Sequence, residues 1–539
     1  MRTCNKSERK SGVLLHITSL PGTPGIGTLG KEAYRFADWL HEAGQSLWQV
    51  LPLGPTGYGD SPYASFSTFA GNPLLVDLAD LVERGWADAA DIVPPDYIKD
   101  NGRIDFGSVV WWKLPVLYKC AAYFLSHANE KDRVAYEAFK NDNAAWLNGF
   151  ADYTSIKKHY DALAQEKGVS GTASMWNAFW PKELASHDPA AVSAWDASHV
   201  QDIEQIKAIQ FFFFVQWHAL KNYVNGLGIQ IVGDIPIFVA GDSADVWANR
   251  KYFQYDQETL QQKTCAGVPP DYFSATGQLW GNPLYDWDVL KRDGYAWWVD
   301  RIRHLLTLVD IVRIDHFRGF EAYWQVPYGS PNAIKGTWVK GPGKDLFDTI
   351  KQRLGTLPII AEDLGVITPE VEALRDGCGF PGMKILQFAF NDNEWSAESA
   401  AIKDLPHNFS GRNLVVYTGT HDNDTSCGFF TSCTETCREN TRRYLGLPSS
   451  AGARELVSGL LRSAFASVAD TCVVPLQDVY AVGTEGRMNM PSTTGTNWAW
   501  RMAPDLLDRG GAELLKGLSL TYGRNLQLLG STEKTGAAE

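Results

Sequence analysis

The sequence predicts an α/β fold, a (β/α)8 TIM barrel with large insertions after strands 2 and 3 at its C-terminal face. Three observations lead to this prediction. Short apolar runs rich in β-branched residues recur along the 539 residues, helical patterns separate them, and eight such runs are present. Continuous apolar runs are typical of parallel strands that are buried on both faces, and eight strand–helix units close a barrel.

The eight predicted strands extend over most of the chain. In order, they are residues 12–20, 46–53, 229–239, 309–315, 358–364, 383–390, 414–422 and 473–480. Amphipathic patterns predict helices at 31–44, 202–225, 287–308, 344–354, 369–376, 435–445 and 453–468. In the first helix, for example, Ala33, Phe36, Ala37 and Leu40 share one face and Gly44 ends the pattern.

Two long segments between strands explain the length of the chain. Residues 57–204 and 240–290 each leave a predicted strand at its C-terminal end, where barrel enzymes carry their active sites. We therefore expect an inserted subdomain and a smaller lid subdomain that wall or cover the site. The barrel itself then consists of residues 1–56 (strands 1 and 2), 205–239 (strand 3) and 291–530 (strands 4–8 and the C-terminal helices), followed by a tail at 531–539.

Composition argues against several classes of protein. The 62 acidic residues outnumber the 49 basic ones and give a net charge of −13, which argues against a nucleic-acid partner. No apolar run approaches the roughly 18 residues of a membrane helix, and no apolar stretch of the secretory kind follows the basic N-terminus. We therefore expect a cytoplasmic protein without membrane contact.

Cysteine usage and aromatic content give weaker indications. The eight scattered cysteines suit free thiols, and their one cluster (Cys427, Cys433 and Cys437) lacks the CxxC or histidine spacing of a zinc site. We expect no metal and no other cofactor. The 20 Trp, 21 Tyr and 25 Phe suit stacking on sugar rings, although on count alone a large aromatic core explains them better.

Three acidic residues lie at the ends of predicted strands that otherwise consist largely of Val, Ile and Leu: Asp315, Glu362 and Asp422. In VDIVRID the period of two places Arg313 and Asp315 on one face. A neighbouring guanidinium favours the charged form of Asp315, which a carboxylate nucleophile requires. The alternative is a buried ion pair with a purely structural role.

The sequence AEDL places Glu362 and Asp363 on opposite sides of the fifth predicted strand. We assign Glu362 to the barrel interior and Asp363 to the support of a loop. An acid beside a hydrophobic wall, with a second carboxylate nearby, tends to stay protonated. Glu362 is therefore a candidate general acid that later acts as a base, with a structural ion pair as the alternative.

The third acid, Asp422, follows His421 in TGTHDND, where Gly419 permits close approach of a ligand to the backbone. Together Asp422 and His421 can bind the hydroxyl groups of a sugar. A histidine beside several carboxylates also permits a metal site, but the HxH and HExxH spacings of such sites are absent.

The motifs RIDHFRG, AEDLG and TGTHDND resemble the signature strands of the amylomaltase family, the 4-alpha-glucanotransferases or disproportionating enzymes, which form a branch of the α-amylase superfamily. Further resemblance lies in SPY at 61–63, FAGNP at 69–73, GDIPI at 233–237, GQLWGNP at 277–283, PGMK at 381–384 and RMN at 487–489. The resemblance therefore covers about residues 12 to 501.

The resemblance implies a retaining transfer of α-1,4-glucan segments between maltooligosaccharides or starch-type glucans, with glucose as an acceptor. It makes Asp315 the nucleophile, Glu362 the general acid/base and Asp422 the third carboxylate, which binds sugar hydroxyls. The residues that it implies in substrate binding are Ser61, Tyr63, Asp234, Trp280, Asn282, Arg313 and His421, with Tyr272 and Phe273 on a loop at 267–273 over the cleft. For that loop, a hydrophobic plug is the alternative.

Two departures from the family pattern bear on the outer subsites and not on the three acids. Residues 487–492 read RMNMPS where a glycine is expected after the proline, and Gln325 stands where an acid is frequent. Two other functions stay open: a retaining α-glucan hydrolase with the same carboxylates, and a non-catalytic glucan-binding barrel. Donor preference, cyclic products and the choice between monomer and homodimer are not decided by the sequence.

Overall fold

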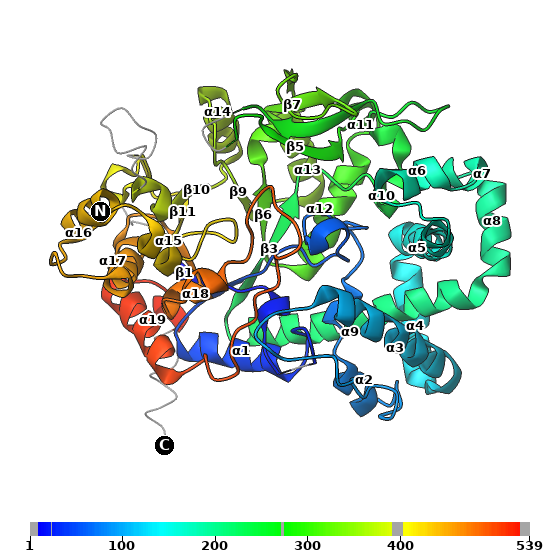
Figure 1. Ribbon diagram of the computed structural model, residues 1–539, viewed down its shortest axis with the longest axis horizontal. Coiled ribbons are helices and arrows are strands. Elements are labelled where there is room, and N and C mark those ends of the chain that lie inside the picture. Colours follow the sequence, from blue (N-terminus) through cyan, green and yellow to red (C-terminus); the bar gives the residue numbers. More distant parts are fainter. Residues whose placement is uncertain (1–8, 23, 271–273, 391–402, 529–539) are drawn as a thin grey trace.

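The computed structural model describes residues 9–22, 24–270, 274–390 and 403–528. Its centre is a sheet of eight parallel strands in the order β10-β11-β12-β1-β2-β3-β6-β9 (Figure 1). The bounds are β1 Lys10–Leu14, β2 Leu47–Gln49, β3 Gln230–Pro236, β6 Ile311–Asp315, β9 Ile359–Ala361, β10 Gly382–Ile385, β11 Leu414–Tyr417 and β12 Thr471–Pro475. The N–H of Ala361 donates to the carbonyl of Pro381 at 2.9 Å, which brings β9 against β10 and closes the barrel.

All eight predicted strands are present, so the predicted (β/α)8 barrel is confirmed. Several of them are shorter than predicted at their C-terminal ends. The predicted strand at 358–364 ends at Ala361, and the one at 473–480 gives way after Pro475 to the short helix α18 Leu476–Val479. The polar ends of these runs leave the sheet and form the loops above the barrel, where the chemistry-bearing residues lie.

Helices surround the barrel where the amphipathic patterns predicted them. They are α1 Lys31–Glu42, α9 Val200–Gly226, α13 Lys344–Leu354, α14 Pro369–Cys378, α16 Glu435–Leu445 and α17 Ala453–Ala466. A further helix, α19 Arg509–Tyr522, lies beyond the predicted patterns. The helix predicted at 287–308 is in fact two, α11 Trp287–Arg292 and α12 Ala296–Leu308. The break occurs because Gly294 and Tyr295 adopt the left-handed conformation, with φ of 61° and 53°.

The segment between β2 and β3 is helical and extends to one side of the barrel (Figure 1). Its helices are α2 Leu78–Glu83, α3 Phe106–His127, α4 Glu130–Asp142, α5 Ala144–Glu166, α6 Trp176–Phe179, α7 Lys182–Ala185 and α8 Pro189–Ser198. After β3 the chain forms α10 Ala244–Ala248 and then a part of a second sheet.

This second sheet, which we call the lid sheet, has four antiparallel strands in the order β5-β4-β7-β8. Strands β4 Thr264–Val268 and β5 Gln278–Pro283 come from the segment after β3, whereas β7 Ala322–Pro327 and β8 Thr337–Lys340 follow β6. None of these four strands was among the strands predicted from the sequence. The sheet lies beyond the end of the barrel at which β6 and β9 terminate (Figure 1).

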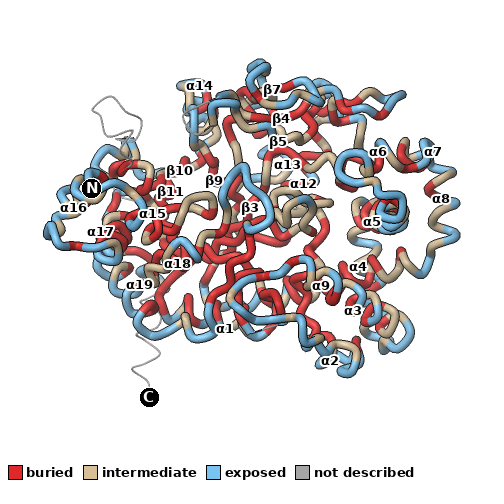
Figure 2. The backbone as a smooth tube through the Cα atoms, viewed as in Figure 1, coloured by how far each residue is buried: buried red, intermediate tan, exposed pale blue. Residues whose placement is uncertain are grey.

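The hydrophobic core follows the barrel strands and the helix faces that cover them. Buried backbone concentrates along β1, β3, β6, β11 and α9, and exposed backbone lies on the outer turns of the peripheral helices (Figure 2). Trp48, Trp217 and Trp298 are almost completely buried, so part of the high aromatic content does fill the core. Within the described residues, no helix has the length and apolar character needed to cross a membrane.

Candidate active site

A cleft of about 650 Å³ opens between the C-terminal ends of the barrel strands and the lid sheet. Asp315 lies on its wall at the end of β6, and Asp422 and His421 come from the loop after β11. Trp280, on β5, contributes from the lid sheet. The cleft is therefore formed by loops and strands that are far apart in the sequence and meet at the face predicted to carry the site.

Arg313 and Asp315 lie on the same face of β6, as the period of two predicted. One guanidinium nitrogen of Arg313 is 3.1 Å from Asp315 Oδ1 and 2.6 Å from Asp234 Oδ2 on the adjacent strand β3. The side chains of Arg313 and Asp234 are buried, at 4% and 0% exposure, whereas 29% of the Asp315 side chain is exposed. Asp315 is thus the member of this ion-pair cluster that reaches the cleft.

Tyr63 connects this cluster to the opposite wall. Its hydroxyl donates to Asp234 Oδ2 at 2.8 Å, and its ring stacks on His421 at a centroid distance of 5.1 Å. Trp498 packs beside both rings, 5.8 Å from each. Burial lowers the pKa of His421, so its ring is held neutral and can exchange hydrogen bonds with a neutral ligand.

Glu362 follows β9 directly and accepts two backbone hydrogen bonds. Its Oε2 accepts from the N–H of His316 at 2.6 Å, and its Oε1 accepts from Leu364 at 2.8 Å. His316, the residue after Asp315, adopts a left-handed backbone with φ of 53°, an uncommon conformation for a residue other than glycine. The chain turns sharply here, and the amide after Asp315 points at the carboxyl group of Glu362.

Asp363 lies on the other side of the chain from Glu362, as predicted. It accepts from the N–H of Met383 at 2.7 Å and pairs with Arg375 on α14. Asp363 therefore has the loop-supporting role that the alternation of side chains indicated.

Burial raises the pKa of Asp315 and of Glu362. At Asp315 the positive charge of Arg313 opposes this rise, while the charges of Glu362, Asp234 and Asp422 add to it. Arg313 therefore favours the charged form of Asp315, as expected, but it acts against burial and the neighbouring acids, which the expectation left out. The two carboxyl groups titrate together and keep one proton to a higher pH than an isolated carboxyl group does.

Asp422 is held by a segment near the C-terminus. Asn489 donates to Asp422 Oδ1 at 2.7 Å, Arg487 donates to the Asp422 carbonyl at 3.0 Å, and His421 Nε2 lies 3.5 Å from the same carboxylate oxygen. Arg487 and Asn489 belong to the RMN motif, but no sequence pattern predicted their contact with Asp422. About 65 residues separate these partners, so only the fold reveals the contact.

The remaining predicted contacts of the sugar lie mostly along the cleft. Ser61, Trp280 and Asn282 line it; Trp280 packs edge-to-face on His316 at 4.8 Å, and Asn282 donates to the Val239 carbonyl at 2.9 Å. Asp234, Arg313 and Glu362 are buried behind the wall and bond to protein groups. Tyr272 and Phe273 lie outside the described residues.

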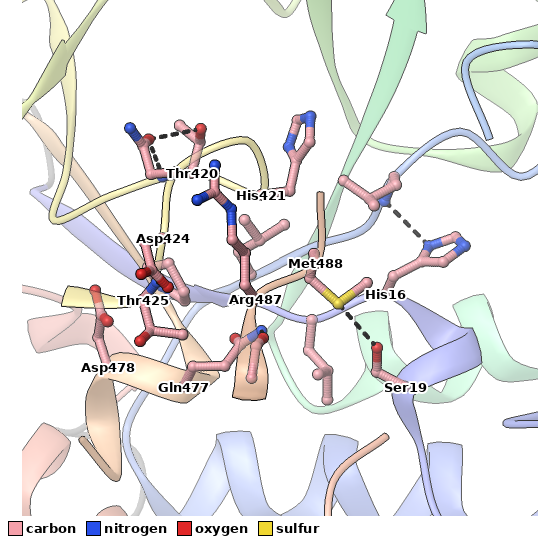
Figure 3. A pocket seen from close by; sticks show the side chains of 16 residues that line it. His16, Ser19, Thr420, His421, Asp424, Thr425, Gln477, Asp478, Arg487 and Met488 are labelled. Atoms are coloured by element: carbon pink, nitrogen blue, oxygen red, sulfur yellow. Dashed lines mark hydrogen bonds between the residues drawn. The ribbon is translucent and has the colours of Figure 1, made fainter. Parts of the chain in front are cut away.

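Asp478 anchors the loop that carries His421 and Asp422, a role that sequence reasoning missed. This buried carboxylate accepts from the hydroxyl groups of Thr418 and Ser426 at 2.5 and 2.7 Å and from the Ser426 amide at 2.8 Å. An acid at the end of the eighth apolar run was the signal that could have identified it. Figure 3 shows Asp478 on the wall of a small cavity that His421, Asp424 and Arg487 also line. The cavity measures about 20 Å³, which is room for about one water molecule.

Gly419 serves packing inside the protein. A Cβ atom at this position would lie 2.6 Å from Nε2 of Gln387, whose amide donates to the Asp424 carbonyl at 2.9 Å. A ligand was expected to approach the backbone at Gly419, but the side chain of Gln387 occupies this position and supports the loop. In the part of the chain that the structure describes, no group of three His, Cys, Asp or Glu side chains is arranged to hold a metal ion.

Comparison with known proteins identifies the family. The family model described as 4-alpha-glucanotransferase matches residues 15–507, which include all three acids of the cleft. The chain belongs to the 4-alpha-glucanotransferase family. A 4-alpha-glucanotransferase of Thermus thermophilus is 47% identical over 511 residues, covering 94% of this chain and 97% of the relative. One from Streptococcus pneumoniae is 44% identical over 519 residues, covering 96% and 98%.

Two solved amylomaltase structures are similar to this chain. An amylomaltase from Streptococcus agalactiae in complex with acarbose has a TM-score of 0.88 and 38% identity, covering 96% of this chain and all of that chain. An amylomaltase from Corynebacterium glutamicum, at 18% identity and a TM-score of 0.70, shares the fold. The resemblance found in the signature strands is confirmed, and the chain is an enzyme of the transglycosidase type.

Proposed function

We propose that this 4-alpha-glucanotransferase transfers α-1,4-glucan segments by a retaining double displacement. The observation that carries the proposal is the backbone link between two acids: the amide after Asp315 donates to Glu362 at 2.6 Å. Retaining enzymes hold their two carboxyl groups about 5–5.5 Å apart, and inverting enzymes hold them about 6.5–9.5 Å apart to admit a water. One hydrogen bond between Glu362 and the residue next to Asp315 favours the shorter spacing.

In the first half-reaction, Asp315 attacks the anomeric carbon and the bond to the departing 4-oxygen breaks. Glu362 gives its proton to that oxygen, and a glycosyl ester of Asp315 forms. The shared proton belongs on Glu362, because Asp315 has the direct ion pair with Arg313 while Glu362 has only neutral amide donors. Asp422 and His421 bind hydroxyl groups of the same sugar from the opposite wall.

In the second half-reaction, Glu362 takes the proton of an acceptor 4-hydroxyl, which attacks the anomeric carbon and displaces Asp315. The acceptor is glucose or the end of another glucan. Two inversions restore the α configuration, and the number of glycosidic bonds stays constant. Tyr63, Trp280 and Asn282 hold the donor chain in this proposal, which their position in the lining of the cleft supports.

The test is to incubate the protein with maltotriose and follow both product lengths and total reducing ends. We expect glucose, maltopentaose and longer chains at constant reducing ends. Asp315→Asn should retain maltotriose binding by calorimetry but lose turnover by about 10³-fold or more, because the ester cannot form. Asp348→Asn, on the exposed face of α13, is the matched control. A rise in the total number of reducing ends would mean that the enzyme is a hydrolase. Near-normal turnover of Asp315→Asn would show that Asp315 is not the nucleophile.

A further inference from the structure

A second large cavity lies outside the barrel, between the inserted helices and α12. This crevice encloses about 580 Å³ between α5, α9, α10 and α12, and none of its lining residues lines the catalytic cleft. The four helices lie to the right of strands β3 and β6 in Figure 1. Pockets that bind small molecules measure about 300–1,000 Å³, so the crevice has the size of a ligand site.

The inner wall of the crevice is aromatic. Trp146 of α5 lies at the centre of a cluster of rings in this wall. Its ring centroid is 6.5 Å from that of Phe69, with 14° between the ring planes, and 5.6 and 5.5 Å from those of Phe214 and His304. Trp297 stands edge-on to Phe69 at 6.4 Å. Trp146 and Phe69 are only partly buried, so flat apolar surface is accessible there.

The rim of the crevice is polar and carries two acids, Asp142 and Asp300, and the cation Arg303. Asn143, Asn249 and Thr307 offer neutral hydrogen-bonding groups. Asp300 forms an ion pair with Arg303. The charge of Arg303 is therefore already balanced and attracts an anionic ligand only weakly. Deeper in the crevice, the carboxylate of Asp245 accepts from the Thr68 amide at 2.7 Å. These groups suit a neutral ligand with apolar faces and polar edges, and not a phosphate or a metal ion.

We propose that this crevice is a second binding site for α-1,4-glucan, separate from the catalytic cleft. The inference rests on the function proposed above, because the glucose rings of that substrate have apolar faces and hydroxyl edges. The crevice is near enough to matter for catalysis. Ser61 lines the cleft and Phe69 the crevice, and eight residues of extended chain span at most about 28 Å.

A long glucan held in the crevice keeps its free part at a high effective concentration near the cleft. Maltotriose is too short to occupy both sites, so it gains nothing from the crevice. The crevice therefore acts on the KM for long chains and leaves kcat and the turnover of maltotriose unchanged.

Gly149 of α5 provides a way to fill the crevice without removing any aromatic ring. It lies in the wall of the crevice, and a Cβ atom there meets only Ala248 Cβ, at 3.8 Å. Gly149→Phe should raise the KM for soluble amylose about tenfold, with kcat and maltotriose kinetics unchanged. The matched control is Gly517→Phe on α19, where nothing lies within 4 Å of the added Cβ. An unchanged KM for amylose in folded Gly149→Phe overturns the proposal.

A second pair of variants guards against misfolding of the first. Trp146→Ala removes the central ring of the crevice, and Trp111→Ala removes a 76% exposed ring of α3 as its control. Only the former should raise the KM for amylose, and equal effects in both variants would contradict the proposal.

Binding measured without turnover separates this inference from the proposed function. By calorimetry, Asp315→Asn should bind two molecules of maltoheptaose, and the double variant with Gly149→Phe should bind one. Binding of only one maltoheptaose in both variants would contradict the crevice proposal, even where the wild-type enzyme disproportionates maltotriose normally. Two sites in Asp315→Asn and one in the double variant support the crevice even where the wild-type enzyme proves to be a hydrolase.

Discussion

Arg313 is a single cation between two carboxylates. Its guanidinium lies 2.6 Å from Asp234 and 3.1 Å from Asp315, so its positive charge is divided between them. Asp234 is completely buried and also accepts from Tyr63, whereas Asp315 faces the cleft. Each carboxylate therefore depends on the same side chain, and the balance between burial and this cation decides when Asp315 is ionised.

Replacement of Arg313 should therefore change the pH dependence of the reaction. In Arg313→Met the ionised form of Asp315 loses its nearest positive charge, so the pKa of Asp315 rises further and the acidic limb of kcat/KM moves to higher pH. In Arg313→Lys the charge remains and the limb should stay near that of the wild type, even where kcat falls. Profiles of kcat/KM between pH 4 and 9 measure this.

Two checks make that comparison decisive. Loss of one partner of a buried ion pair costs about 3–5 kcal/mol, so circular dichroism must first show that Arg313→Met is folded. Arg509→Met, at an 83% exposed position of α19, controls for the loss of a positive charge in general. An acidic limb that coincides in folded Arg313→Met and in the wild type would show that Arg313 does not set the ionisation of Asp315.

Among the elements, apolar runs made the barrel strands predictable and exposed strands escaped prediction. The eight barrel strands are largely buried, and most of them lie within runs rich in Val, Ile and Leu, as expected of strands that helices cover on the outside. Strand β8, Thr337–Lys340, is exposed at three of its four positions, so its sequence carries no run that marks a core strand. Strand β7 pairs with β4, a non-local contact that no local pattern contains, and β8 joins the sheet by pairing with β7.

The candidate site divides in the same way. Asp315, Glu362 and Asp422 were predictable, because an acid at the end of a buried strand conflicts with its surroundings. Asp478 carried the same signal at the end of the eighth apolar run, although its contacts with Thr418 and Ser426 appear only in the fold. Asn489 was not predictable, because it supports the loop after β11 from a segment more than 50 residues away. Local sequence thus identifies charged groups whose burial costs free energy, whereas the contacts that position these groups become visible only in the folded chain.

Helix α3 contains a buried lysine, Lys113, whose titration should make the free energy of unfolding depend on pH. The Lys113 side chain is 2% exposed and donates to the Leu74 carbonyl, and burial lowers its pKa to about 7 from an ordinary 10.5. The folded state then binds fewer protons than the unfolded chain between about pH 7 and 10.5, so this residue makes the free energy of unfolding rise with pH. From pH 7 to 9 the rise should be about 2 kcal/mol.

Urea unfolding of the wild type and of Lys113→Met at pH 7 and pH 9 measures this contribution. The wild type should gain about 2 kcal/mol relative to the variant between the two values of pH. Lys119→Met, on the exposed side of the same helix, should keep the pH dependence of the wild type. Parallel pH dependence in wild type and Lys113→Met would show that the amine stays charged in the folded protein.

Across the whole molecule, the lid sheet consists of two pairs of strands that the barrel strand β6 separates in sequence. Strand β4 pairs with β7 in the middle of the sheet, at Cys265 with Val326 and Gly267 with Trp324 among other positions. Each cross-strand pair contributes about 0.2–1 kcal/mol, and its partners must fit each other. The two pairs of strands therefore form one folding unit, although the chain enters the barrel between them.

Exchange of lid segments with the Streptococcus agalactiae amylomaltase should expose this dependence. Replacement of the segment 264–283 alone places foreign β4 against native β7, and we expect the melting temperature to fall by about 5 °C. Simultaneous replacement of 322–340 should restore most of it, because both partners then come from one protein. Equal melting temperatures for the two hybrids would mean that the β4–β7 contact tolerates any partner.

The arrangement of the lid also constrains how such enzymes can diversify by recombination. Any continuous stretch of gene that encodes β4, β5, β7 and β8 together also encodes β6, and with it Arg313 and Asp315. A single exchanged fragment can therefore transfer all four strands of the lid sheet only along with Asp315, the proposed nucleophile, and its partner Arg313. The lid sheet and the proposed nucleophile are in this sense inherited as one block, so a lid that is exchanged whole stays matched to the barrel strand beneath it.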